Sequence, residues 1–484
     1  MLLANEDYLR VLAKSLRDEI LPELTTDSGR ATLITAVEAL QDLIKREHNL
    51  PAIITAIAPE GIDLLNRIAD LVDRPRHEEP LPADPKGFAA LINQIDEGVR
   101  LLLGRPVDRS AKQVSALLRD VAHWEERYYL AFGESTLLPE AATEERPDLL
   151  TADTLAAALQ SRLHKDIVVK DVETVPGGFV HQTLFFTLER AGHADQKLVV
   201  RKKSAHPILN FWGGLLKDEY QIVSTLHERG LPVAQPLWLF EDRPDVAGAF
   251  YVMTRGAGRS AGSLRDAYSG GQQFSEALML SLAEFLGRLH SIPLETFADY
   301  LRTGDTRVQL GDTVTEATSK NVADIFDLWH RRQRLAVPSE AYMLDWLRRN
   351  IPEDDSRPVL VHGDCFVHNL IVDENDCIQL VADWETAHIG SPVTDLAYIK
   401  DQVVKYIDWQ KFVSRYRDAG GPTVNEAHLP YYNALLNYRN SWGSNIAVAR
   451  IKDGFQDIRM LPLSSEYFTG FLHGSIESMS KNEG

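Results

Sequence analysis

Two aspartates and one asparagine in the last third of the sequence could together carry out phosphoryl transfer. Asp364 and Asn369 are separated by four residues in the run VHGDCFVHNLIV, and Asp383 follows two strand-like apolar runs. Transfer of a phosphoryl group to a hydroxyl needs a carboxylate that accepts or orients the hydroxyl proton. It also needs oxygen ligands that hold Mg²⁺ against nucleotide phosphates. The spacing predicts Asp364 as the base and Asn369 and Asp383 as metal ligands.

The elements that must position these residues are short strands. One strand-like run, Leu370–Val372, follows Asn369, and another, Cys377–Ala382, precedes Asp383. If the two runs form a hairpin, Asp383 returns to the end of the sheet where Asn369 lies. One base and two oxygen ligands would then share a cleft.

Each of the three residues also has a purely structural interpretation. Asp364 could cap a loop, Asn369 could be a turn residue before a strand, and Asp383 could be a buried, hydrogen-bonded aspartate. A structural role for one of the three residues would be unsurprising. Purely structural roles for all three, in this order between apolar runs, would be an improbable coincidence. We therefore favour the chemical interpretation.

The same residues resemble the aminoglycoside phosphotransferase and choline kinase superfamily. The family hallmark HGDxxxxN matches His362–Asp364 and Asn369, and its later D-x-[DE] element matches Asp383–Glu385. The run GSPVTDLA, which begins at Gly390, is also similar to the family, and the resemblance extends from about Leu150 to the C-terminus. Within the superfamily, LVVRKK and the later pair EY look closest to the branch related to the kinase-like domain fused to some acyl-CoA dehydrogenases.

This resemblance implies an α+β fold, namely a bilobal protein-kinase-like fold with a small β-rich N-lobe and a helical C-lobe, preceded by an all-α accessory domain. It implies ATP and Mg²⁺ as cofactors and a hydroxyl of a small molecule as acceptor. The cofactor-binding residues would lie in a phosphate turn, on the third strand, on the following helix and in the linker between lobes: Gly177, Gly178, Arg201, Glu219, Met253, Thr254 and Gly256.

Some nucleotide-binding assignments leave alternatives open. The Gly177-Gly178 turn is equally typical of a plain hairpin. Arg201 offers a forked donor to phosphates, and strand alternation points the competing Lys202 to the opposite face. Glu219 would pair with Arg201 or be an exposed helix glutamate.

Three residues around the catalytic segment carry weaker signals. Glu385 is assigned as a further metal ligand, with a solvent-facing position as the open alternative. We favour His362 as a support of the loop backbone over a proton shuttle. Asp395 resembles the family's buried aspartate that hydrogen-bonds the catalytic loop, which is a structural role.

The organisation of the chain predicts a helical region before the kinase-like part. Apolar residues recur at helical spacing up to about Ser135, and no alternating strand pattern occurs there. Prolines and acidic residues then mark a linker, and β-branched runs follow. We expect a helical accessory domain at 1–137, a linker at 138–150, the N-lobe at 151–256 and the C-lobe at 257–484.

Composition limits the classes of partner. The 484 residues exceed what a single core usually supports, and the formal net charge is −19. This charge disfavours nucleic acid and anionic membranes as partners; it suits a cationic substrate or, as we favour, simple solubility. Two cysteines without CxxC spacing predict neither a disulfide framework nor structural zinc. Because we find no signal peptide and no apolar run of about 20 residues, we expect a cytoplasmic protein.

The acceptor stays open at the level of sequence. The branch that the chain resembles implies a hydroxyacyl-CoA or a hydroxy acid, for which Arg331, Arg332 and Arg334 are candidate cations, or merely a solvated helix face. The superfamily at large implies an aminoglycoside-type antibiotic kinase. A different class of function is a non-catalytic nucleotide-binding regulator, which the intact catalytic set disfavours. The N-terminal helices could form a homodimer or bind a partner enzyme.

Overall fold

The computed structural model divides into two compact units. Unit 1 contains 1–139, 322–352 and 430–484, and unit 2 contains 140–321 and 353–429. Within them the structure describes residues 9, 12–14, 16–24, 27–78, 81–82, 84–104, 111–131, 150–163, 166–175, 180–204, 216–241, 248–262, 273–297, 308–331, 334–449 and 466–482.

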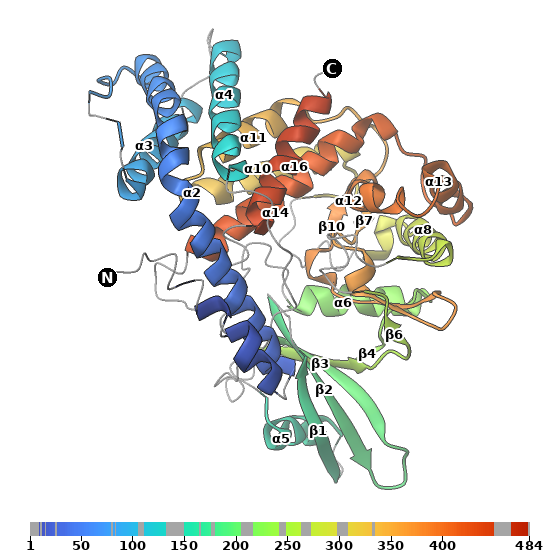
Figure 1. Ribbon diagram of the computed structural model, residues 1–484. Coiled ribbons are helices and arrows are strands. Elements are labelled where there is room, and N and C mark those ends of the chain that lie inside the picture. Colours follow the sequence, from blue (N-terminus) through green and yellow to red (C-terminus); the bar gives the residue numbers. More distant parts are fainter. Residues whose placement is uncertain are drawn as a thin grey trace. The chain divides into compact units, whose positions relative to one another are not determined.

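A five-stranded antiparallel sheet begins unit 2 (Figure 1). Its strands are β1 (Ile167–Val175), β2 (His181–Arg190), β3 (Gln196–Lys203), β4 (Pro236–Phe240) and β5 (Phe250–Thr254), in the order β1-β2-β3-β5-β4. On β2 every second residue from Leu184 to Leu188 is buried, as expected for a strand with one face on a core. Helix α5 (Ala152–Leu163) packs on this face through Leu155 and Leu159.

Two smaller sheets follow in unit 2 and flank the segment that contains Asp364, Asn369 and Asp383. Strand β7 (Val359–Val361) pairs with β10 (His388–Gly390), and β8 (Leu370–Val372) pairs with β6 (Arg259–Ser260) and β9 (Ile378–Val381). Because β8 and β9 form an antiparallel hairpin, the expected return of the chain after β9 is confirmed.

The helices of unit 2 include α6 (Leu216–Glu228), α8 (Glu276–His290), α12 (Val393–Val403) and α13 (Trp409–Asp418). Helix α8 is amphipathic, starts with a Ser275 side-chain cap on the Leu278 amide, and buries one face. Ring contacts tie the elements together, since His290 of α8 meets Tyr416 of α13.

The regular elements among the described residues of unit 1 are all helical. Its helices are α2 (Asp27–Val72), α3 (Pro85–Leu103), α4 (Ala111–Leu130), α11 (Pro338–Arg349), α14 (Leu429–Ala449) and α16 (Glu466–Asn482), preceded by the short turns η1 (Leu16–Ile20) and η2 (Leu21–Glu23). Trp124 of α4 is fully buried and donates from Nε1 to the Ile57 carbonyl of α2, 2.9 Å away. Its ring also meets Phe88 of α3. Aromatic packing therefore joins the first three long helices.

The expected α+β fold class is confirmed: a helical N-terminal region precedes an antiparallel sheet and then further helices. The domain ranges group differently, because 322–352 and 430–484 join the N-terminal helices instead of an uninterrupted C-lobe. The boundary between the units crosses α10 (Val314–Arg331). Buried polar contacts of α11 with α4 account for this grouping, such as the Ser339 amide on Glu125. Among the described residues, no helix has the length and apolar character that a membrane span requires.

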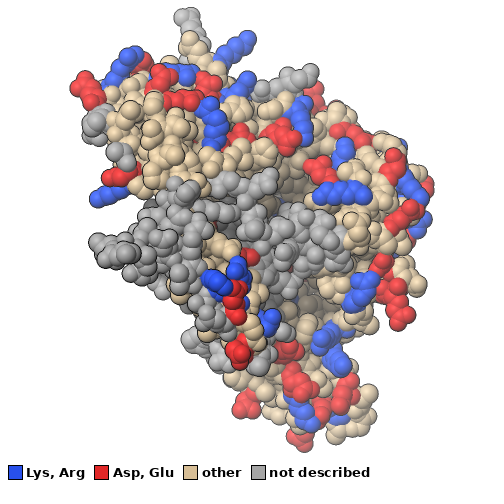
Figure 2. Space-filling model, in the orientation of Figure 1, with Lys and Arg blue, Asp and Glu red and all other residues tan. Residues whose placement is uncertain are grey.

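The surplus of acidic residues is not gathered in one place on the face drawn in Figure 2. Acidic and basic side chains alternate across the described part of that face. Such mixing fits the interpretation of the net charge as a means of solubility, rather than as an acidic docking surface.

Candidate active site

One buried carboxylate, that of Asp395, binds the backbone of the loop that begins at His362 and leads to Asp364. Asp395, in the first turn of α12, accepts the backbone amides of His362 (2.9 Å) and Gly363 (2.7 Å) and lies 3.1 Å from His290 Nε2. Gly363 has a φ of +81°, which glycine adopts without strain. Burial would raise the pKa of Asp395, but hydrogen bonds and the charge of neighbouring histidines lower it. Asp395 therefore acts as an anion that fixes the loop backbone.

His362 completes the loop through both ring nitrogens. Its Nδ1 lies 3.2 Å from the Asp364 amide, which donates, and its Nε2 lies 3.0 Å from the Ala382 carbonyl. The ring packs on Trp384 at 4.4 Å between centroids. With both nitrogens bonded to backbone groups, the geometry matches the expected support of the loop.

Asp364 follows this turn, and side chains contact both of its carboxylate oxygens. Tyr398 of α12 donates to Oδ1, Asn369 Nδ2 donates to Oδ2 at 3.1 Å, and His368 Nε2 lies 3.3 Å from Oδ2. Burial raises the pKa of Asp364, but the charge of His368 and these hydrogen bonds outweigh it and lower the pKa to about 2. The side chain stays partly exposed, so an ionised carboxylate faces solvent.

The hairpin brings Asn369 and Asp383 to one end. Leu370 pairs with Val381, and the Ala382 amide donates to the Asn369 carbonyl at 2.9 Å. Asn369 uses its amide nitrogen on Asp364, which leaves the amide oxygen as an acceptor for another partner. Asp383 has a left-handed backbone (φ +63°), which is sparsely populated for residues other than glycine. Such a conformation re-aims the side chain at the point where β9 ends.

Arg201 of β3 meets the acidic pair at this end. Its Nη2 lies 2.6 Å from Asp383 Oδ1 and 3.1 Å from Glu385 Oε2. Burial and the charge of Asp383 raise the pKa of Glu385 well above its usual range. Glu385 is mostly buried and does not face solvent, so it belongs to the same cluster as Asp383.

Glu219 of α6 pairs with the other side of Arg201. Its Oε1 lies 3.3 Å from Arg201 Nε and accepts from the Tyr251 hydroxyl at 3.1 Å. Burial by itself would lower the pKa of Arg201. The negative charges of Asp383, Glu219 and Glu385 outweigh burial and raise the pKa of Arg201 well above its ordinary value. Glu219 is buried, unlike an exposed helix glutamate, and it belongs to the pair that the resemblance implied.

His181 extends the cluster beyond Glu219. Its Nε2 lies 3.7 Å from Glu219 Oε2, and burial together with the charge of Arg201 lowers its pKa to about 3. A neutral imidazole at this place adds no second positive charge. Lys202, by contrast, directs its Nζ to the Lys203 carbonyl, which agrees with the expectation that it points away from Arg201.

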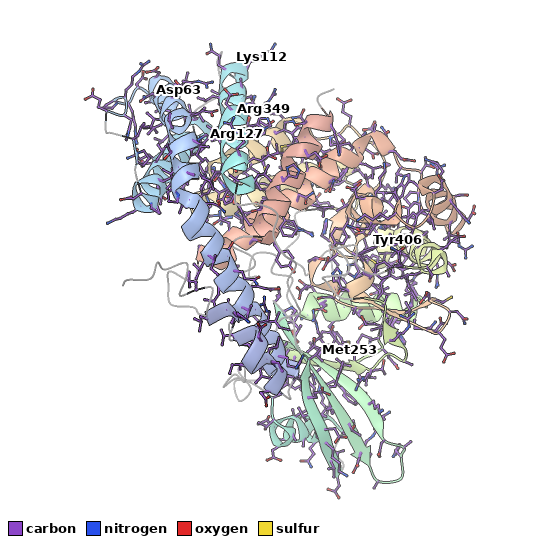
Figure 3. The ribbon with its side chains drawn as sticks, in the orientation of Figure 1. Asp63, Lys112, Arg127, Met253, Arg349 and Tyr406 are labelled. Carbon is purple, nitrogen blue, oxygen red and sulfur yellow. The ribbon has the colours of Figure 1, made fainter. Side chains whose placement is uncertain are left out.

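The residues expected on the nucleotide side are only partly described. Gly177 and Gly178 lie outside the described residues. Met253, labelled in Figure 3, and Thr254 end β5, directly beside β3. Gly256 approaches Leu380 of β9 so closely that a Cβ would lie 2.7 Å from its Cδ1. The segment after β5 therefore runs against the hairpin that carries the acidic pair, while its contact with a nucleotide stays a prediction.

Metal binding at this site has to be judged from the donors. In the described part of the chain, no three His, Cys, Asp or Glu side chains form a ready-made metal cluster. Asn369 and Asp383 instead offer an amide and a carboxylate oxygen, which is the type of set that Mg²⁺ completes with phosphates and water. A divalent cation would also relieve the repulsion between Asp383 and Glu385 that raises the Glu385 pKa. The donor set thus fits Mg²⁺.

Sequence reasoning missed several residues of the site. Asp364 is contacted by Tyr398 and His368, Arg201 by Thr183, and Glu219 by Tyr251. His368 stands beside Asn369 in the motif and could have been noticed from that position. The others come from separate elements, so no spacing in the sequence could indicate them.

One expectation about the acceptor is wrong. Arg334 is almost fully buried in unit 1 and pairs with Asp96 at 3.0 Å, so it cannot be a surface cation for a CoA ester. Arg331 is exposed and lies 4.0 Å from Asp327, and Arg332 lies outside the described residues.

Comparison with known proteins bears on the whole kinase-like part. A family model described as "Phosphotransferase enzyme family" (APH) matches residues 171–432. Acyl-CoA dehydrogenase family member 11 of Mus musculus is 29% identical over 208 residues, which are 42% of this chain and 25% of that protein. The protein of the same name from Gallus gallus is 31% identical over 223 residues, or 44% and 26%. The chain therefore spans about a quarter of the length of these curated relatives.

Solved structures of phosphotransferases resemble this chain at low sequence identity. Spectinomycin phosphotransferase APH(9)-Ia, in complex with ADP and spectinomycin, is 13% identical with a TM-score of 0.44, and the match covers 69% of this chain and 99% of that one. The resemblance noted from the motifs is confirmed by the family model. Because that model covers more than half of its residues, the chain belongs to the phosphotransferase enzyme family, APH.

Proposed function

We propose that this phosphotransferase moves the γ-phosphate of ATP, with Mg²⁺, to a hydroxyl of a small molecule, namely a hydroxyacyl-CoA or a related hydroxy acid. One observation supports the proposal most. Asn369 contacts Asp364 directly, and the β8–β9 hairpin returns Asp383 beside Asn369. Base and metal ligands are thus neighbours in unit 2.

Asp364 would orient the acceptor hydroxyl and receive its proton. With a pKa of about 2, its carboxylate is ionised and weakly basic at neutral pH. A weak base takes the proton late, after the oxygen has begun to bond to phosphorus. The new P–O bond forms as the bond to ADP breaks, and the proton moves to Asp364. Positioning then contributes more to the rate than basicity, as in other phosphoryl transfers.

The other residues would hold the nucleotide. Asn369 and Asp383 would bind Mg²⁺, which when bound neutralises charge between the phosphates, and Glu385 would be a further ligand. Arg201, fixed by Glu219, would reach a phosphate with its forked donors. Gly177 and Gly178 would approach the phosphates with their backbone, and Met253, Thr254 and Gly256 would contact adenine.

The names of the curated relatives support the proposed acceptor class. Both carry names of acyl-CoA dehydrogenases, although this chain spans only about a quarter of each. Because these relatives are named for acyl-CoA chemistry, we propose a hydroxylated acyl-CoA as the acceptor of this chain. An aminoglycoside is the alternative acceptor, in keeping with the APH family model. A partner enzyme or homodimer through the N-terminal helices stays a prediction, as does the cytoplasmic location, which the two free cysteines suit.

The test is a screen for Mg²⁺-dependent ADP release with 4-hydroxyacyl-CoA, free hydroxy acids and aminoglycosides as acceptors. We expect turnover with a hydroxyacyl-CoA, and Asp364→Asn should lower it about a thousandfold while ATP binding persists. Glu276→Gln is the matched control, since it removes an exposed carboxylate that pairs with Lys411 instead. Unchanged turnover in the Asp364 variant would refute the assignment, and ATP binding without any transfer would favour the non-catalytic regulator.

A further inference from the structure

We infer that Tyr398 is a positioning residue for the catalytic carboxylate, and that Oδ1 of Asp364 is the oxygen that meets the acceptor hydroxyl. The inference rests on the proposed function, because it concerns how Asp364 performs its role there. Neither the hallmark motif nor the D-x-E element contains Tyr398. Its place in the fold, not its place in the sequence, brings it to the site.

Helix α12 contacts three consecutive residues of the catalytic loop. Asp395, in its first turn, binds the backbone amides of His362 and Gly363, and Tyr398 donates its hydroxyl to the Asp364 side chain. Residues three apart on a helix lie on one face. The same face of α12 therefore fixes both the backbone of the loop and the direction of its carboxylate.

The helix itself is anchored independently of substrate. Asp395 is fully buried and lies 3.1 Å from His290 Nε2, and His290 Nδ1 lies 3.0 Å from the Tyr416 hydroxyl. This chain of contacts ties α12 to α8 and α13. A hydroxyl held by such a rigid element can define the position of its acceptor closely.

Counting lone pairs separates the two carboxylate oxygens. Each carboxylate oxygen can accept about two hydrogen bonds. Oδ2 is approached by two donors, Asn369 Nδ2 at 3.1 Å and His368 Nε2 at 3.3 Å. Within the described residues, Oδ1 has Tyr398 as its protein partner and keeps one acceptor site. The acceptor hydroxyl would donate to that remaining site, next to the Tyr398 hydroxyl.

Removal of the Tyr398 hydroxyl should then lower turnover without weakening nucleotide binding. Phenylalanine keeps the ring and its packing, but the carboxylate loses the contact that fixes its rotation. We expect Tyr398→Phe to reduce kcat about tenfold to a hundredfold, since small misplacement of a reacting group has effects of that size. KM and Kd for ATP should change less than about twofold, because no nucleotide-binding residue is touched.

A double-mutant cycle distinguishes positioning from general support of the fold. Transfer of radiolabelled γ-phosphate makes the residual rate of Asp364→Asn measurable, and Tyr398→Phe is added to it. If Tyr398 acts through Asp364, the second substitution has little further effect in that background. Tyr431→Phe is the matched control: its buried hydroxyl bonds the Leu347 carbonyl in unit 1, so its loss should leave kcat unchanged.

The outcomes separate this inference from the proposed function. A Tyr398 variant with wild-type kcat, or with the same fold loss in both backgrounds, overturns the inference. Equal rates for the wild type and Asp364→Asn would instead overturn the proposed function. A crystal structure of Tyr398→Phe gives a readout that needs no activity: we expect a rotated Asp364 carboxylate, and an unmoved one contradicts the inference.

Discussion

Two buried arginines, one in each unit, show how the same chemical groups can form either a site or a core. Arg201 in unit 2 and Arg334 in unit 1 are both less than a tenth exposed, and each contacts more than one carboxylate. Arg201 contacts Glu219, Asp383 and Glu385, whereas Arg334 contacts Asp96 and Glu340. Both clusters contain more acidic than basic groups.

The partners of Arg334 are closed off from solvent. Glu340 is fully buried and accepts from Trp329 Nε1 at 2.9 Å and from Asn445 Nδ2 at 2.8 Å. Arg334 also lies over the Trp329 ring, 4.3 Å from its centroid. Buried charges that pair with each other inside the protein can specify how helices pack, and burial keeps them from a ligand.

The partners of Arg201 are open on one side. The Asp383 side chain is 32% exposed, and its backbone has the left-handed conformation noted above. Asp364 and Asn369, which lie beside this cluster, each keep an oxygen with capacity for a further bond. Exposure, rather than burial of charge, therefore distinguishes the predicted site from the buried cluster around Arg334.

The largest expected effect comes from Arg334→Met in unit 1. Removal of one partner of a buried ion pair leaves the other uncompensated, at a cost of about 3–5 kcal/mol. Urea unfolding should show that loss, while kcat per folded molecule stays within about twofold of the wild type. A stable variant with lost turnover would break the comparison, because unit 1 would then take part in the chemistry.

Arg201→Met should show the reverse pattern. We expect kcat/KM for ATP to fall about a hundredfold, which is typical for the loss of a donor to a charged reaction centre. Stability should also fall, because Glu219 stays buried without its partner, but the fall should be smaller than for Arg334→Met, because Asp383 is partly exposed and can be hydrated. Steady-state kinetics and urea unfolding on the same samples check both parts. A stability loss as large as that of Arg334→Met would mean that Arg201 is mainly structural.

Glu125 gives unit 1 a dependence of stability on pH. It is fully buried beside the Ser339 amide, and burial raises its pKa to about 8, as it raises that of Glu340 to about 7. A carboxyl whose pKa is higher in the folded state binds protons more tightly there. The resulting stabilisation is complete below the unfolded pKa of about 4.5 and is lost as the pH rises to about 8.

Glu125→Gln should therefore flatten the pH profile. Between pH 5 and pH 8, the free energy of unfolding of the wild type should fall more steeply than that of the variant. The difference is at most ~1.4 kcal/mol per pH unit for one proton. Urea unfolding at several pH values measures the two slopes. Parallel slopes would show that Glu125 does not exchange a proton on unfolding.

The sequence allowed the candidate site residues to be named but not the groups that hold them. Asp364, Asn369 and Asp383 lie within twenty residues, so motif spacing and one hairpin sufficed to predict their proximity. Arg201 followed from the family resemblance, and strand alternation separated it from Lys202. Tyr398 depends on how α12 packs against the loop, and no local pattern encodes that. Arg334 and Asp96 are 238 residues apart, so their pairing, and with it the composition of unit 1, arises only from tertiary packing.

The smallest expected effect concerns the cluster around Arg201. It comes from removing one contact between Arg201 and an uncharged side chain. Thr183 Oγ1 accepts from Arg201 Nη1 at 3.2 Å. Valine keeps the shape of the side chain, and three carboxylates would still fix the guanidinium. We expect Thr183→Val to weaken ATP binding about threefold, a fraction of the usual effect of a hydrogen bond to a charged group.

Thr187→Val is the matched control for this change, because Thr187 lies four residues along on the same face of β2. Isothermal titration with ATP and Mg²⁺ compares the two variants with the wild type. A loss at Thr183 as large as that of Arg201→Met would show that the threonine contributes directly to the nucleotide site. Equal, negligible changes in both variants would show that the carboxylates alone hold Arg201 in place.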